Sequence, residues 1–376
     1  MLNSFSKLLG HNYKPLNRIE ISKSALKHNY IYLNSLNKKI KIAPVLKSNA
    51  YGHGITLIAK ELDSYNSPLF CVDSLYEAYE LLKIRIKTPI LIMGYFNPKS
   101  LQTKKLPFSF AVFTKEQIIS INKYQPQAKI HIFVDTGMHR EGVLINELEN
   151  FLSFIKSKTN LKIEGLMSHL AMSEKPRILN TKRQIKTFKN ALDIVNKNNI
   201  FPKWVHFANS SGTLNFNAYE DTLSNLSRAG LALYGIDPVG KNKELMPILR
   251  LITRIIEIKE IQKGDYVGYN FSFKAKKDMK IAILPIGYND GVDLRLSNLG
   301  CVKIGRKYCS IIGRVSMNIT TIDVSNIKDI HFGQEVIVYS NKRKDKNSVE
   351  NVARLINTIP YEIFVHLTPS TKRILN

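Results

Sequence analysis

The chain has 376 residues, 44% of them hydrophobic, so it can bury a sizeable core and form two or three domains. Its 55 Lys and Arg residues against 30 Asp and Glu give a formal charge of +25, but they are scattered and frame no recognisable nucleic-acid module. We therefore interpret the charge as background that helps anionic small molecules approach, and rank a nucleic-acid-binding function last.

The cysteines and the N-terminal segment indicate a cytoplasmic protein. Cys71, Cys301 and Cys309 include no CxxC pair and leave one thiol over, which is typical of a reducing compartment. Residues 1–17 lack the continuous apolar run of a signal peptide and the length of a membrane span.

Apolar stretches alternate with amphipathic ones between Ile40 and Leu233. The candidate strands cover residues 40–46, 69–72, 89–93, 108–113, 129–134, 163–167, 204–207 and 227–233. The predicted helices cover residues 19–36, 55–62, 74–82, 115–122, 147–155 and 181–195. Such alternation indicates a parallel sheet with helical crossovers, and eight units are the number that closes an α/β barrel.

The pattern changes at about residue 238. Leu249–Ile261 alternates apolar and charged residues, and short apolar runs bounded by Gly, Asn, Asp or Lys follow it. One late helix is predicted over residues 348–355. We therefore predict a (β/α)8 barrel of the TIM type over residues 1–240, followed by a mostly β domain over residues 241–376.

The segment VLKSNAYGHG, residues 45–54, places Lys47 directly after the first candidate strand. In parallel α/β barrels the carboxyl ends of the strands carry the active site. A lysine in partly apolar surroundings there can act as the nucleophile that forms a Schiff base with an aldehyde such as pyridoxal phosphate. An isolated lysine at a strand end is more often an ordinary snorkelling side chain, so its neighbours decide between the two interpretations.

Polar side chains also follow other candidate strands. Arg140, His169, Ser210 and Arg228 each lie at or just after such a strand. Taken singly, they fit surface ion pairs, a core histidine or a helix cap. Because the carboxyl ends of barrel strands converge, the four together predict a ring of groups that face one point.

A phosphorylated aldehyde cofactor would need partners of known kinds at this rim. Ser210, Gly230 and Leu231 can offer a hydroxyl and backbone N–H groups to its phosphate, with Tyr51 or Tyr288 donating from the side. An arginine facing the pyridine nitrogen would keep that nitrogen unprotonated, because a guanidinium does not give up its proton. The ring would then be a weak electron sink that favours simple proton exchange.

The chain resembles the alanine racemase family over essentially its full length. The matching segments are VLKSNAYGHG (45–54), DTGMHREGV (135–143), GLMSH (165–169), HFANS (206–210), SRAGLALYG (227–235), VGY (267–269), PIGYNDG (285–291) and IGRVSM (312–317). The first segment is highly specific, and the shared order and spacing of all eight make coincidence implausible.

The resemblance implies a pyridoxal-phosphate barrel followed by a β domain, assembled as a head-to-tail homodimer. It implies interconversion of L- and D-alanine, with D-alanine used for the cell wall, and no metal, nucleic acid or membrane partner. Lys47 matches the lysine that carries the cofactor and acts as one base, and Tyr269 matches a second base from the partner subunit. Two bases are needed because a proton removed from one face of Cα must return on the other.

The resemblance also assigns the remaining positions. Arg228 matches the residue at the pyridine nitrogen. Arg228 and His169 are also the matched candidates for lowering the pKa of Tyr269, which its role as a base requires. Arg140 matches a residue beside the cofactor's phenolic oxygen and the substrate carboxylate. Met317 matches the residue whose backbone N–H binds the same carboxylate from across the dimer. The positions matched to the phosphate site are Tyr51, Ser210, Gly230 and Leu231.

Three positions depart from the family pattern. Phe133 stands where many relatives carry a lysine, often carbamylated, that orients the arginine, so Arg140 must be held otherwise, with Glu141 as a candidate. Asn318 replaces a usual aspartate, and Pro369 falls where some relatives place a phosphate-binding tyrosine. None of these positions is one of the two predicted bases.

Other functions stay open at this point. The chain can be a racemase of another small amino acid or one of broad specificity. A barrel decarboxylase is disfavoured because Arg228, not a carboxylate, is predicted at the ring nitrogen. Non-enzymatic pyridoxal-phosphate carriers have the barrel alone, and residues 240–376 argue against that class.

Overall fold

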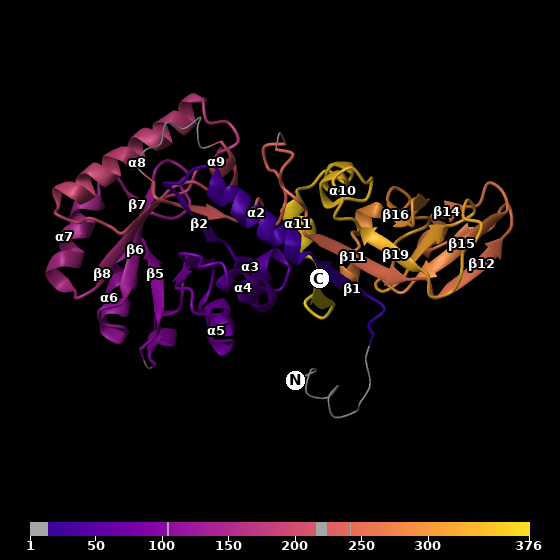
Figure 1. Ribbon diagram of the computed structural model, residues 1–376, viewed down its shortest axis with the longest axis horizontal. Helices are drawn as coiled ribbons and strands as arrows, with labels where there is room; N and C mark the ends of the chain where they lie inside the picture. The colour runs from indigo at the N-terminus through magenta and orange to yellow at the C-terminus, as the bar shows by residue number, and fades with distance from the viewer. Residues whose placement is uncertain (1–13, 104, 216–223, 241) are drawn as a thin grey trace. The chain divides into compact units, whose positions relative to one another are not determined.

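A computed structural model describes residues 14–103, 105–215, 224–240 and 242–376 (Figure 1). The chain forms two compact units: residues 23–246 make one, and Pro247–Asn376 with the described residues up to Ser22 make the other. Most of the segment in which we predict no signal peptide, residues 1–17, lies outside the described residues. None of the helices in the described parts of the chain is long and apolar enough to cross a membrane.

Eight parallel strands form a nearly closed barrel in the first unit. They are β2 (Lys41–Pro44), β3 (Phe70–Val72), β4 (Ile90–Ile92), β5 (Phe108–Val112), β6 (Lys129–Asp135), β8 (Lys162–Met167), β9 (Trp204–His206) and β10 (Leu226–Ala229). Their order in the sheet is β2-β10-β9-β8-β6-β5-β4-β3. A parallel bridge between Val45 and Cys71 joins the two ends. The predicted α/β barrel is confirmed.

Helices lie along the outside of these strands, as Figure 1 shows for α5 to α8. The helices of this unit are α2 (Lys23–Ser35), α3 (Lys47–Tyr51), α4 (Ile55–Asp63), α5 (Leu75–Lys83), α6 (Lys115–Tyr124), α7 (Leu148–Lys158), α8 (Leu179–Lys197) and α9 (Ser210–Leu214). A 3-10 turn, η1 (Pro98–Leu101), and a two-residue strand, β7 (Val143–Leu144), complete it. Local sequence sets the helix starts: the Ser74 side chain accepts from Glu77 N, and Thr114 forms a capping box with Gln117.

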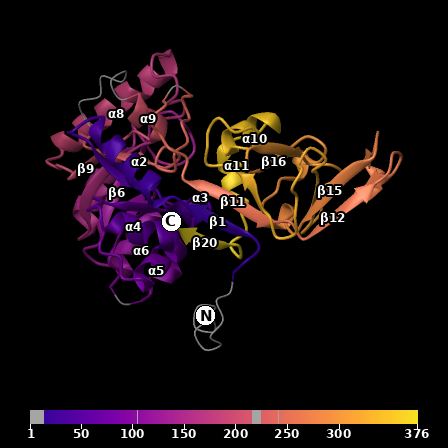
Figure 2. The ribbon, with the colours of Figure 1, turned by 45° about the vertical axis from the view of Figure 1, so that its right-hand side comes forward.

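The second unit is rich in sheet. Its strands are β1 (Arg18–Ile21), β11 (Leu249–Arg254), β12 (Glu257–Ile261), β13 (Tyr266–Val267), β14 (Phe273–Lys274), β15 (Met279–Leu284), β16 (Cys301–Ile304), β17 (Lys307–Ser310), β18 (Thr320–Asp323), β19 (Glu335–Tyr339) and β20 (Lys372–Leu375). Its helical segments are η3 (Tyr269–Phe271), η4 (Tyr288–Asp290), η5 (Leu294–Leu296), α10 (Val349–Leu355) and α11 (Pro360–Val365). The main sheet runs β17-β16-β19-β11-β1-β20, and β12-β15-β18 form a second sheet, whose β12 and β15 lie side by side in Figure 2.

One predicted element is wrong at its start. Residues 19–36 are predicted to be helical, but β1 takes Ile19 and Ile21 into the main sheet, antiparallel to β11 and parallel to β20. Both isoleucines are fully buried, and Glu20 between them pairs with Arg18 and Arg250. This alternation has the period of a strand, and the helix α2 begins only at Lys23.

Candidate active site

Lys47 lies at the carboxyl end of the first barrel strand, as predicted. β2 ends at Pro44, two buried residues follow, and Lys47 opens the short helix α3. Its side chain is 40% exposed, and its Nζ lies 3.9 Å from Oδ1 of Asp73, which follows β3. The lysine is therefore held at the rim of the barrel while its amine stays accessible to a small molecule.

The backbone after Lys47 is unusual. Four consecutive residues, Ser48 to Tyr51, have φ between 52° and 55°, in the left-handed region, although none is glycine. Such a conformation costs roughly 1–2 kcal/mol per residue. Glu77 accepts a hydrogen bond from Asn49 N at 3.1 Å, and the Asn49 side chain accepts one from Ile55 N at 2.8 Å. Because strain of this kind persists only where surrounding contacts over-determine it, the turn fixes Lys47 and Tyr51 relative to each other.

Tyr51, Ser210 and Gly230 form a cradle on the same rim. The Ser210 hydroxyl oxygen accepts hydrogen bonds from Gly230 N at 2.9 Å and Ala232 N at 3.2 Å. A Cβ at position 230 would lie 2.6 Å from the Tyr51 hydroxyl, so glycine is needed for the ring to stay in place. Leu231 is buried beside them. The hydroxyl hydrogens of Ser210 and Tyr51 can donate to an anion, so the cradle fits a phosphate group.

Arg228 is buried at the end of β10. Its Nη1 donates to Nδ1 of His206 at 2.9 Å and to the His206 carbonyl oxygen at 2.8 Å. Its Nη2 donates to the Ser168 carbonyl oxygen at 2.5 Å and lies 3.4 Å from Nδ1 of His169. Burial lowers the pKa of Arg228 to about 10, so the guanidinium remains charged at neutral pH.

His169 lies close enough to three other predicted site residues for their charges to affect its pKa. Burial, followed by the charges of Arg228, Arg140 and Lys47, lowers the pKa of His169 to about 3. These positive charges act on one imidazole because the ends of β2, β6, β8 and β10 converge. His169 is therefore neutral at neutral pH, and it can accept a hydrogen bond.

A chain of buried polar groups leads from Arg228 down the barrel. Nε2 of His206 lies 2.8 Å from Nδ1 of His131, and Nε2 of His131 lies 3.5 Å from Oε2 of Glu164. Glu164 also pairs with Lys129 Nζ at 2.8 Å and accepts from the Ser109 hydroxyl at 2.9 Å. Burial works to raise the pKa of Glu164, but the hydrogen bonds from His131, Lys129 and Ser109 outweigh it and lower that pKa to about 2.

The sequence analysis did not identify this series of buried polar groups. His131 and Glu164 stand inside strands β6 and β8, and His206 ends β9. Polar residues within otherwise apolar strands were the available signal, because a buried polar group requires a partner. Gly165 makes room for it, since a Cβ at that position would lie 2.2 Å from Nδ1 of His131.

Arg140 lies in the loop after β6, half exposed. Its Nε and Nη2 donate to the two carboxylate oxygens of Glu141, the latter at 2.9 Å, so the pair is bidentate. Phe133, at the position of the family lysine, is buried and packs edge-on against Phe113 with the ring centroids 6.4 Å apart. An apolar contact thus replaces any polar support from residue 133, and Glu141 holds the arginine.

The other three predicted residues lie in the sheet-rich unit. Tyr269 follows Gly268, which has φ 81° and packs against residues 313–314, and its side chain is 68% exposed. Tyr288 and Met317 belong to two loops that are tied together, since Tyr288 N donates to Ser316 O and Asn289 N to Met317 O, both at 3.0 Å. The part that these three residues play at a shared site stays a prediction.

An exposed amine next to a cradle for a phosphate, at the strand ends of a barrel, is the arrangement that an enzyme using a phosphorylated aldehyde needs. The model of the alanine racemase N-terminal domain matches residues 21–238, and that of the C-terminal domain matches residues 248–375. The chain belongs to the alanine racemase family. It is therefore an enzyme of the family whose reaction is the racemisation of alanine.

Individual proteins show the same similarity. Alanine racemase 1 of Caldanaerobacter subterraneus is 34% identical over 367 residues, 95% of this chain and 94% of that protein. Alanine racemase of Bacillus anthracis with bound L-Ala-P superposes with a TM-score of 0.89 at 29% identity, covering 97% of this chain and 96% of that one. Alanine racemase of Bartonella henselae with covalently bound pyridoxal phosphate gives 0.82 at 27% identity, covering 96% and 100%.

Proposed function

We propose that the chain interconverts L- and D-alanine with pyridoxal phosphate held on Lys47, using Lys47 and Tyr269 of the partner subunit as the two bases. The observation that carries this proposal is the strained turn that fixes the Lys47 amine beside the cradle of Tyr51, Ser210 and Gly230. When bound, the cofactor draws electrons from the substrate and makes its Cα–H bond acidic.

The cradle is the reason for choosing this cofactor. Its hydroxyl groups and the small residue at position 230 suit a phosphate, and the Lys47 amine suits an aldehyde. Leu231 and Tyr288 are further proposed contacts of the phosphate. The Bartonella relative, whose structure contains covalently bound pyridoxal phosphate, supports the same choice.

Arg228 is proposed to face the pyridine nitrogen. Its Nη1 and Nη2 groups already donate to backbone oxygens and to His206, and the guanidinium stays charged at neutral pH. It would therefore leave the ring nitrogen unprotonated and the ring a weak electron sink, which favours proton exchange over decarboxylation.

Tyr269 is proposed to reach the opposite face of the substrate from the β domain, residues 241–376, of a head-to-tail partner. Its side chain is largely exposed on a loop that the left-handed Gly268 shapes, so its phenol is available to another chain. His169, kept neutral beside Arg228, can accept a hydrogen bond from that phenol. A base on each face of Cα is what racemisation requires.

The substrate carboxylate is proposed to meet Arg140 and the backbone N–H of Met317 from the partner. The bidentate pair with Glu141 fixes the Arg140 guanidinium, which keeps its Nη1 N–H groups for an anion. We further propose that the D-alanine supplies peptidoglycan synthesis in the cytoplasm. The three free cysteines, two of them buried, support a reducing compartment.

A chirality-resolved assay over the small amino acids, with and without added pyridoxal phosphate, tests this function. We expect alanine to give the highest kcat/KM and the activity to depend on the cofactor. Equal rates on serine or larger amino acids would support a broad-specificity racemase, and release of CO2 without racemisation would support a decarboxylase.

A further inference from the structure

A second pocket opens at the amino ends of the barrel strands, whereas Lys47 lies at their carboxyl ends. Its volume is about 410 Å³, and it lies where β4, β5, β6 and β8 begin. Pockets of a few hundred cubic ångströms are the size of small-molecule sites. Nothing in the proposed reaction uses this one.

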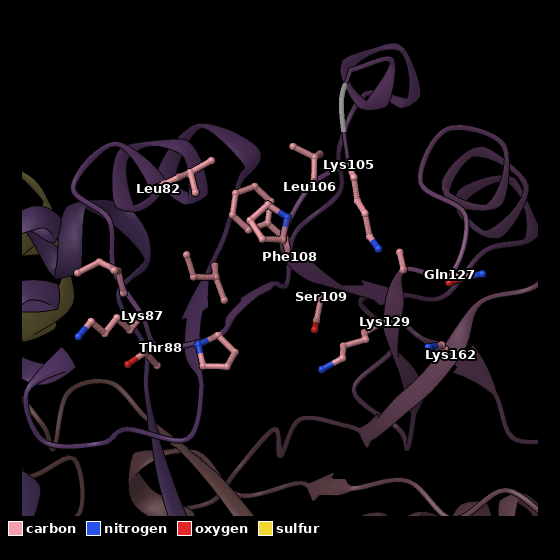
Figure 3. Close-up of a pocket in the computed structure, with 15 residues that line it drawn as sticks. Leu82, Lys87, Thr88, Lys105, Leu106, Phe108, Ser109, Gln127, Lys129 and Lys162 are labelled. Carbon is pink, nitrogen blue, oxygen red and sulfur yellow. The ribbon is translucent and has the colours of Figure 1, made fainter.

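Four lysines line this pocket. Figure 3 shows Lys87 on one side of the hollow and Lys105, Lys129 and Lys162 on the other. None of the described residues that line it is acidic. Within the described part of the chain, the Lys105 and Lys162 ammonium groups form no ion pair, and Lys129 alone is paired, with Glu164.

Two carboxylates, Asp63 and Glu164, lie beside two of these lysines. Asp63 accepts hydrogen bonds from the backbone N–H groups of Lys87 and Thr88 and from the Thr88 hydroxyl. Glu164 is bound by Lys129, Ser109 and His131. The four lysines of the pocket outnumber these two carboxylates, so it keeps an excess of positive charge that an added anion can offset.

The wall between the lysines is apolar. Leu82, Pro89, Ile90, Leu106 and Phe108 form it, and the Ser109 hydroxyl lies near its centre in Figure 3. Leu82 and Pro89 are exposed, so a simple inorganic anion would leave their surface in contact with water, whereas Ile90, Leu106 and Phe108 are already buried. A ligand that covers the wall gains roughly 25 cal/mol per Å² of apolar surface removed from water.

We propose that this pocket is a second ligand site, for a small organic phosphate whose phosphate groups meet the lysines and whose ring covers the apolar wall. Four cations arranged around one hollow call for at least two negative charges, which a nucleoside diphosphate carries. A nucleic acid strand fits less well, because the four lysines gather around one hollow and do not follow a groove along the surface.

The site has a physical route to the active site. Lys129 is both a wall of the pocket and the ion-pair partner of Glu164, from which the buried chain runs through His131 and His206 to Arg228. A phosphate that draws Lys129 away removes one of the contacts that keep Glu164 charged. A ligand bound in the pocket would then change how firmly Arg228 is held. The effect of this change on turnover rests on the proposed function.

Isothermal titration calorimetry on the cofactor-loaded enzyme tests the site without reference to turnover. We expect ADP to bind with one site per chain, and inorganic phosphate and adenosine each to bind at least tenfold more weakly. High salt should weaken ADP binding. No heat of binding with millimolar ADP, equal affinity for phosphate alone, or much tighter binding of a single-stranded oligonucleotide would overturn the proposal.

A matched pair of double variants locates the site. Lys105→Glu with Lys162→Glu should lower ADP affinity at least tenfold, with an unchanged far-UV circular dichroism spectrum and thermal midpoint. Lys27→Glu with Lys60→Glu makes the same change of charge on the exposed faces of α2 and α4 and should alter affinity less than twofold. Equal losses in both would show a non-specific effect of net charge and overturn the site.

A racemisation assay with added ADP tests the coupling. Saturating ADP should change kcat at least twofold in the wild type. In Glu164→Gln the effect should disappear while ADP binding persists, because the neutral amide no longer holds Lys129. Binding without any change in turnover in the wild type would overturn the coupling and leave the site itself supported by calorimetry.

Discussion

The guanidinium of Arg228 donates to Nδ1 of His206 at 2.9 Å, and this contact sets the protons of both buried histidines. Since Nδ1 of His206 accepts, its Nε2 carries the hydrogen and donates to Nδ1 of His131. Nε2 of His131 then carries its hydrogen toward Glu164. Both rings are neutral, in keeping with burial, which lowers the pKa of each.

The Gly230→Ala variant tests the cradle. Its Cβ would lie 2.6 Å from the Tyr51 hydroxyl, so the ring must move and the phosphate site must change shape. We expect affinity for pyridoxal phosphate to fall at least tenfold, as overpacking costs about 1–3 kcal/mol. Cofactor titration followed by absorbance measures it. Tyr51→Phe alone should also weaken cofactor binding, because it removes a hydroxyl that we propose to donate to the phosphate, and an unaffected Gly230→Ala variant would contradict the assigned cradle.

Replacing Lys47 by alanine removes the only group that we propose to bond the cofactor. The purified wild type should show the visible absorption band of lysine-bound pyridoxal phosphate, and Lys47→Ala should lose it together with racemisation. Lys60→Ala, on an exposed face of α4, serves as the control and should keep both. A band that persists in Lys47→Ala would place the bond on another lysine.

The Tyr269→Phe variant separates proton transfer from cofactor binding. We expect kcat to fall about 10²-fold or more, the usual contribution of one acid–base group, while the absorption band stays. The deuterium isotope effect at Cα should rise for the enantiomer whose proton the phenol removes, because that step becomes limiting. Wild-type activity in this variant would sink the two-base proposal.

Mixing the two inactive variants tests whether a site is shared between chains. In a head-to-tail dimer, a Lys47→Ala chain paired with a Tyr269→Phe chain contains one intact site and one doubly altered site. Random exchange should therefore restore roughly a quarter of wild-type activity. Verified subunit exchange without any recovery of activity would show that each chain builds its site alone.

The sequence predicted the barrel well because each strand is an apolar run bounded by polar residues, and Lys47 follows such a run. The prediction failed where neither the spacing of apolar residues nor the side-chain types gave a local signal. The left-handed turn at residues 48–51 contains no glycine, so nothing local indicates its conformation. The alternation of Ile19, Glu20 and Ile21 has the period of a strand, but it is too short to separate these residues from the helical spacing that follows until the pairing of β1 with β11 is known. Long-range contacts decide both.

Glu141 pairs with Arg140, whereas the buried Phe133 gives it no polar support. Glu141→Gln keeps the size of the side chain but removes the charge that pairs with Arg140. Because the pair is half exposed, the free energy of unfolding should change by less than about 1 kcal/mol. We expect KM for alanine to rise severalfold with little change in kcat. Glu149→Gln, at an exposed position of α7, is the control, and an equal KM in both variants would contradict this role.

Glu164 makes the stability of the barrel depend on pH. Its pKa is lowered from 4.5 to about 2 in the folded chain, so its contribution to the free energy of unfolding is fully present above about pH 5 and lost as pH falls toward 2. Since one pKa unit corresponds to about 1.4 kcal/mol, Glu164→Gln should lower the free energy of unfolding by at most about 3.5 kcal/mol at pH 7. The difference from the wild type should shrink steadily between pH 5 and pH 3. Urea unfolding at several pH values measures it, and a difference that stays constant over this range would show that Glu164 is not the charged end of the buried chain.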